Sequence, residues 1–90
     1  MNGDRLLDYN NVIAGERLKI IRESLGLKRN EMAFVLGVTD KLLQNYETGH
    51  KKIGIDFAKS IYDVYKANPI FLTFGIGEPI LNKNLEDLFK

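Results

Sequence analysis

The sequence contains no cysteine, no tryptophan, one histidine and only two prolines among its 90 residues. The absence of cysteine excludes a disulfide scaffold and every thiolate metal site. A single histidine disfavours a histidine-based zinc site. No nucleophile–base pair, carboxylate pair or phosphate-binding glycine loop stands out. We therefore expect no metal, no cofactor and no enzymatic activity.

Long apolar runs are also absent, so no segment is predicted to span a membrane. The first eleven residues are polar and include acidic side chains, which does not fit a secretory signal. The formal net charge of +1 argues against a strongly basic surface for binding nucleic acid, although positive charge can still concentrate locally. These features predict a soluble cytoplasmic domain, and 90 residues suffice for one domain.

Hydrophobic residues recur with the period of an α-helix, and no segment alternates convincingly with period two. Glycines that follow these periodic stretches are typical helix ends. Helices are predicted at about 13–25, 29–36, 40–48, 55–67 and 69–74, with a last amphipathic turn after Asn84. Inward positions include Ile13, Leu18, Ile21, Leu25, Phe57, Ile61, Val64 and Tyr65. The predicted fold class is therefore all-α, with five short helices and a short C-terminal extension.

Two of these helices, at 29–36 and 40–48, are joined by Gly37-Val38-Thr39, a spacing typical of a helix-turn-helix motif. Small Ala33 allows the two helices to approach closely, and Gly37 suits a sharp left-handed turn. Thr39 is a favourable N-cap for the second helix. Apolar positions suited to holding the helices together are Met32, Leu36, Val38, Leu43 and Tyr46.

Four segments in this order resemble the Xre/Cro/CI-type helix-turn-helix family. They are R-L-K-x-x-R-x-x-L-G-L from Arg17, E-M-A-x-x-L-G-V-T from Glu31, Y-E-x-G from Tyr46, and N-P-x-F-L-x-x-G from Asn68. The resemblance implies a five-helix, lambda-repressor-like DNA-binding domain over 13–75. An N-terminal arm at 1–12 would precede it, and the extension at 76–90 would follow. The resemblance also implies a buried ion pair between Arg22 and Glu47.

By the same resemblance, the third helix would enter the major groove of double-stranded DNA. Its outward residues, the expected base readers, are Asp40, Lys41, Gln44 and Asn45. Gln44 or Asn45 suits adenine and Lys41 suits guanine. Asp40 either accepts a hydrogen bond from cytosine or caps the helix.

The DNA backbone would be held by residues near the two ends of this helix. The expected backbone contacts are Lys28, Arg29, Thr39, His50, Lys51 and Lys52. An ordinary solvated loop is the alternative for Lys51 and Lys52, and His50 is expected at the surface. Between Glu16 and Lys52 there are eight basic and five acidic residues, so positive charge concentrates in this half.

The expected function is sequence-specific regulation of transcription by a dimeric repressor of phage or controller type. The alternative is an antitoxin-like module that neutralises a protein partner and regulates its own operon. Apolar residues after Asn68 would partly complete the core and partly form a homodimer interface, unless the extension wraps its own domain. They are Phe71, Leu72, Phe74, Ile76, Ile80, Leu81, Leu85, Leu88 and Phe89. Phe34 is expected either under an arm carrying Leu6, Leu7 and Tyr9 or at a partner site.

Overall fold

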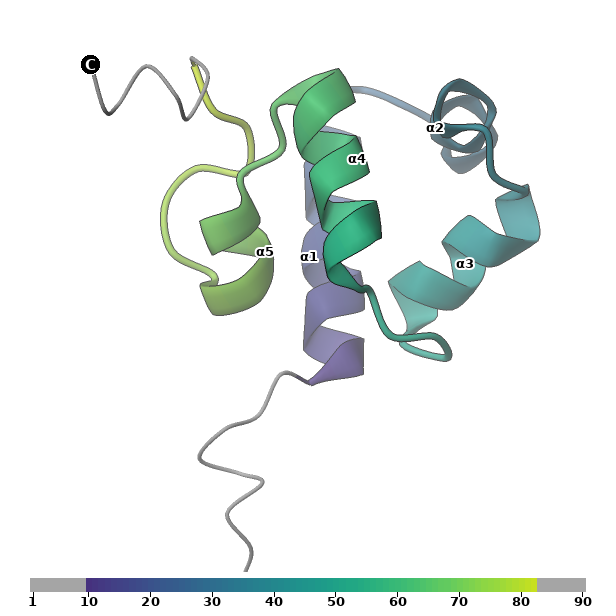
Figure 1. The fold of residues 1–90 in the computed structure, drawn as a ribbon, viewed down its shortest axis with the longest axis horizontal. Coiled ribbons are helices and arrows are strands. Elements are labelled where there is room, and N and C mark those ends of the chain that lie inside the picture. Colours follow the sequence, from purple (N-terminus) through teal and green to yellow (C-terminus); the bar gives the residue numbers. More distant parts are fainter. Residues whose placement is uncertain (1–9, 83–90) are drawn as a thin grey trace, which may run out of the picture.

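A computed structural model describes residues 10–82, and within them the chain forms five α-helices and no strand (Figure 1). The helices are α1 (Asn11–Ser24), α2 (Arg29–Leu36), α3 (Asp40–Thr48), α4 (Ile55–Tyr65) and α5 (Pro69–Phe74). Figure 1 shows α1 and α4 in the middle, with α2 and α3 on one side and α5 on the other. The predicted all-α, five-helix fold is confirmed.

The N-terminal end of α1 is set by Asn10. Its side-chain oxygen accepts hydrogen bonds from the backbone N–H groups of Val12 and Ile13, at 2.8 and 3.3 Å. These bonds satisfy two of the free donors at the start of a helix. The helix therefore begins at Asn11, two residues before the expected start, and part of the expected arm at 1–12 is helical.

The inward face of α1 differs from the predicted one. Ala14, Leu18 and Ile21 are buried, whereas Ile13 is exposed and the predicted inward position there is wrong. The reason is that α1 presents Ala14 and the adjacent glycine to α3, which turns the neighbouring Ile13 outward.

The core draws on all five helices. Its largest fully buried side chains are Leu18, Ile21, Met32, Leu43, Ile61 and Leu72. Val64 is half exposed, so the predicted inward position there is wrong: the inward face of α4 is formed by Ile61 with Ala58 and Tyr65, and Val64 lies at the edge of that face. Phe71 packs against the core while remaining partly exposed.

The start of the expected C-terminal extension is hydrogen-bonded to the chain between α4 and α5. Buried Asn68 caps α5 and donates its side-chain amide to the Glu78 carbonyl at 2.9 Å. The Asn68 backbone N–H donates to Pro79, and Leu81 donates to Lys66, each at 2.8 Å. Residues up to 81 are therefore hydrogen-bonded to the five-helix body, and the expected boundary at 75 stays a prediction.

Some expectations concern residues outside 10–82. They are the covering arm with Leu6, Leu7 and Tyr9, and the last amphipathic turn with Leu85, Leu88 and Phe89. Among the residues the structure describes, no helix is long and apolar enough to cross a membrane.

Candidate nucleic-acid interface

The helix-turn-helix is formed by α2, a tight turn and α3. Gly37 adopts the left-handed conformation with φ 73°, which costs a residue without a side chain little. Ala33 is buried where the two helices approach. Thr39 then caps α3, and its hydroxyl oxygen accepts from the Leu42 backbone N–H at 3.0 Å. These roles of Gly37, Ala33 and Thr39 agree with the sequence prediction.

Close contact with α1 fixes the position of α3. Gly15 lies in the middle of α1, and a Cβ there would come within 2.5 Å of the Glu47 carbonyl oxygen. Only a residue without a side chain allows the two backbones to come this near. Sequence reasoning missed this contact, although an isolated glycine inside a helical pattern was the available signal.

The predicted partners Arg22 and Glu47 form the second connection between α1 and α3. Arg22 Nε lies 2.6 Å from Glu47 Oε2, and Arg22 Nη2 lies 3.0 Å from Oε1. Arg22 Nη1 also donates to the Leu27 carbonyl at 2.9 Å. The two side chains are only 11% and 6% exposed. Hydrogen bonding to Glu47 raises the pKa of Arg22 above its ordinary value.

The opposite face of α3 is polar and faces away from the core. Leu43 and Tyr46 are buried, and the Tyr46 ring lies 4.4 Å from the Phe57 ring. Residues on the outward face are Asp40 and Lys41, which are exposed, and Gln44 and Asn45, which are partly exposed. All four predicted base readers therefore lie on one surface of one helix.

At the N-terminal end of α3, the structure pairs two predicted DNA contacts with each other. Arg29 Nε and Nη2 donate to the two carboxylate oxygens of Asp40, each at 3.1 Å. This hydrogen bonding lowers the pKa of Asp40 and raises that of Arg29. Asp40 is the first residue of α3, and Thr39 is the residue that caps the helix.

Lys28 lies beside this pair, at the start of α2. It is the N-cap residue of α2, and its side chain makes no cap hydrogen bond. The Glu31 carboxylate accepts from the Lys28 backbone N–H at 2.7 Å. The Lys28 side chain is exposed, so its charge is available at this end of α3.

At the other end of α3, the loop folds back on the helix. The Lys51 backbone N–H donates to the Asn45 carbonyl at 3.1 Å, and His50 Nδ1 lies 2.7 Å from the Thr48 hydroxyl. His50 and Lys51 are exposed beside the end of α3. Lys52 differs from them, because it borders a groove between the start of α4 and α5.

The basic residues counted in the sequence do not all lie near α3. Arg17 Nη1 donates to the Thr73 and Leu72 carbonyls at the end of α5, at 2.9 and 3.4 Å. Figure 1 shows α5 on the side of the molecule away from α3. The charge count along the sequence therefore overstated the positive charge at the candidate interface.

Phe34 on α2 is 86% exposed. None of the residues between 10 and 82 covers it. The proposed cover by residues of the arm lies outside the described residues.

Comparison with known proteins identifies the class to which this fold and surface belong. Residues 18–72 match the helix-turn-helix family, and this match spans more than half of the chain. The chain belongs to the Xre/Cro/CI-like helix-turn-helix family, which is a family of DNA-binding domains and not of enzymes.

Two archaeal relatives carry the name of an HTH-type transcriptional regulatory protein. The protein of Thermococcus kodakarensis is 43% identical over 73 residues, which cover 78% of this chain and 23% of the relative. The protein of Pyrococcus furiosus is 40% identical over 53 residues, which cover 59% of this chain and 17% of the relative. The chain thus spans less than a quarter of the length of either relative. No solved structure matches it.

Proposed function

We propose that the chain is a sequence-specific DNA-binding regulator of transcription that reads the major groove with α3. The observation that carries the proposal is the polar face of α3 with basic residues at both ends. Lys28 lies at one end, next to Arg29, which is paired with Asp40, and Lys51 lies at the other end, next to His50. Nine residues of helix extend about 13 Å, and the major groove is about 12 Å wide. Basic side chains at both ends of such a helix suit the phosphates on the two edges of the groove.

In this arrangement some residues in and around α3 contact bases and others contact phosphates. Lys41, Gln44 and Asn45 face the base edges, where an amide pairs with adenine and an ammonium with guanine. Thr39 keeps its hydroxyl proton for a phosphate, because its oxygen serves as the cap acceptor. Lys51 supplies charge without reading sequence.

The test is selection of the purified protein against a randomised DNA duplex library at about 100 mM salt. We expect one enriched motif, and binding that weakens steeply as salt rises because counterions are released. Enrichment of no motif would contradict the proposal. Gln44→Ala and Asn45→Ala should each relax the preference at one base position. Unchanged motifs in both variants would contradict the assignment of the base readers.

A matched pair of lysine variants separates phosphate contact from general charge. Lys51→Ala should weaken binding to all sequences alike and reduce the slope of log K against log salt by about 0.9. Lys19→Ala removes the same charge from the exposed face of α1 and should leave that slope unchanged. Equal effects of the two variants on this slope would contradict a contact between Lys51 and the phosphates.

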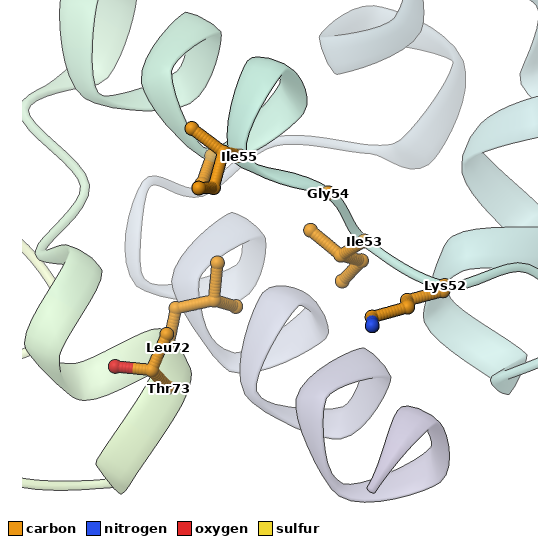
Figure 2. A pocket seen from close by; sticks show the side chains of 7 residues that line it. Lys52, Ile53, Gly54, Ile55, Leu72 and Thr73 are labelled. Atoms are coloured by element: carbon orange, nitrogen blue, oxygen red, sulfur yellow. The ribbon is translucent and has the colours of Figure 1, made fainter. Parts of the chain in front are cut away.

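We further propose that the regulator acts as a homodimeric repressor of phage or controller type that occupies a promoter. A groove of about 320 Å³ lies between the start of α4 and α5, and Figure 2 shows Ile53, Ile55 and Leu72 directed into it. Ile55 is 85% exposed at this groove. A large exposed apolar side chain beside an apolar groove favours a protein–protein contact, and a two-fold contact uses the same surface on both copies.

Sedimentation at micromolar to tens of micromolar protein tests the dimer. We expect a concentration-dependent dimer mass that Ile55→Ser reduces. Val64→Ser is the control, because Val64 is a half-exposed apolar residue that does not line the groove. A monomer mass at every concentration would contradict the dimer.

The antitoxin-like alternative is favoured by one observation, the exposure of the neighbouring apolar residues Phe34 and Val35 on α2. Such a pair suits a protein partner that sits beside the DNA-reading surface. Purification of the native complex tests it: a stoichiometric partner lost on Phe34→Ser would support this function, and a partner-free native protein would contradict it.

A further inference from the structure

The ion pair between Arg29 and Asp40 joins the first residue of α2 to the first residue of α3. Two parallel hydrogen bonds of 3.1 Å hold the carboxylate against the guanidinium. The side chains remain 36% and 46% exposed, so solvent and ligands reach both groups. This pair therefore lies on the surface assigned to DNA and is not part of the core.

Asp40 gives the outward face of α3 a negative charge. The other acid of α3, Glu47, is buried against Arg22 on the side toward α1. A carboxylate on a DNA-facing surface repels every phosphate, whatever the base sequence. Its ion pair with Arg29 also cancels a positive charge that would otherwise attract the backbone. Both effects weaken binding to all DNA.

A base can offset this repulsion at particular positions. An ionised carboxylate has about four acceptor sites, and Arg29 occupies two of them. The remaining sites suit an amino group in the major groove, such as the N4 amino group of cytosine. Because Arg29 binds the carboxylate at two points, Asp40 is already held in one orientation when the DNA arrives.

From this geometry we infer that Asp40, positioned by Arg29, is a specificity-determining residue that suppresses sequence-independent DNA binding. Its charge opposes binding at every site, and a donating base restores the lost affinity only where the sequence provides one. The inference rests on the proposed function, since it requires α3 to face DNA.

The experiment measures binding of the wild-type protein and Asp40→Asn to two labelled duplexes between 50 and 300 mM salt. One duplex carries the motif obtained by selection, and the other is a random-sequence duplex of equal length. Asp63→Asn is the matched control, because Asp63 also pairs with a basic residue, Lys59, at 2.8 Å but lies on α4. Circular dichroism of each variant checks the fold.

For the random duplex, Asp40→Asn should steepen the slope of log K against log salt by about 0.9. If the two proteins bind equally at 1 M salt, this difference in slope makes the variant bind roughly 5- to 10-fold more tightly at 0.1 M salt. The selected duplex should gain less, so the ratio of specific to random affinity falls. Asp63→Asn should change neither slope nor ratio.

Arg29→Gln tests the positioning role separately. It leaves the Asp40 charge in place and removes its partner, so binding to the random duplex should weaken. Because Arg29 orients Asp40, the selected duplex should lose more affinity than the random one, and an equal loss on both would refute the positioning role of Arg29.

The results that overturn the inference differ from those that overturn the proposed function. Equal behaviour of Asp40→Asn and Asp63→Asn, with wild-type binding intact, would refute the role of Asp40 alone. An equal gain on both duplexes would show a charge effect without specificity and would also refute it. Wild-type protein that binds neither duplex would refute the proposed function, and the inference with it.

Discussion

The two ends of α3 each carry an arginine–carboxylate pair, and the two pairs differ in burial. Glu47 and Arg22, at the C-terminal end, are 6% and 11% exposed, with bonds of 2.6 and 3.0 Å. Asp40 and Arg29, at the N-terminal end, are 46% and 36% exposed, with both bonds at 3.1 Å. The same chemistry thus occurs in two surroundings on one helix.

Burial decides what each pair does. A buried charge that loses its partner stays out of water and costs several kcal/mol, whereas an exposed charge is rehydrated. The pair at Glu47 therefore holds α3 on α1. The pair at Asp40 contributes little to the stability of the fold, and its unused carboxylate acceptor sites remain open to solvent and ligands. The C-terminal end of α3 is therefore held by a buried ion pair, and the ion pair at its N-terminal end is exposed to solvent and ligands.

The largest expected effect comes from removing the buried partner. Glu47→Ala should lower the free energy of unfolding by about 3–5 kcal/mol, because Arg22 is left without its counter-ion. Urea denaturation followed by circular dichroism measures it. A loss below about 1 kcal/mol would show that the pair does not hold α3.

A substitution at the α1–α3 contact should have the next largest effect. Helix propensity alone predicts that Gly15→Ala stabilises the protein by about 0.5–1 kcal/mol. The Cβ, however, would meet the Glu47 and Tyr46 carbonyl groups, so we expect destabilisation by about 1–3 kcal/mol. The sign of the change in the urea midpoint decides between the two.

Gly54→Ala is the control for Gly15→Ala. No atom lies within 4 Å of a Cβ at Gly54, and its φ of −90° suits any residue. We expect a change of at most about 0.5–1 kcal/mol. A loss as large as that of Gly15→Ala would mean that the close backbone contact is not the cause.

The smallest effect on stability is expected at the exposed pair. Asp40→Asn should lower the unfolding midpoint at neutral pH only slightly relative to the wild type, since both charges are solvated. Because the pKa of Asp40 is lowered in the folded protein, its contribution is present above the ordinary aspartate range and disappears as pH falls below it. A wild-type advantage at pH 7 that vanishes in acid fits this assignment, whereas an advantage that grows in acid contradicts it.

The sequence was sufficient for the elements and not for all their boundaries. Helical periodicity and the Gly37 turn predicted five helices and the helix-turn-helix. The start of α1 was missed by two residues because Asn10 caps it from outside the apolar pattern. The hydrogen bond from buried Asn68 to the chain ten residues later could not be predicted from local spacing.

The candidate site could also be predicted only in part, because some of its contacts join residues that are remote in sequence. The outward face of α3 follows from helical spacing within one short segment. The individual roles of the cations do not, because their partners are remote in sequence. Arg17 reaches the end of α5, and Arg29 binds Asp40 eleven residues away. Local patterns carry no information on these contacts.

The sequence by itself determined the class of fold, the helix-turn-helix and the polar face of its second helix, since each depends on spacing over a few residues. Only the tertiary structure decided which charges remain available on that face. The packing of α1 against α3 buries Arg22 with Glu47, and the approach of α2 to α3 joins Arg29 to Asp40. The electrostatic character of a surface depends on which charges lie within a few ångströms of one another, and that is fixed by the fold.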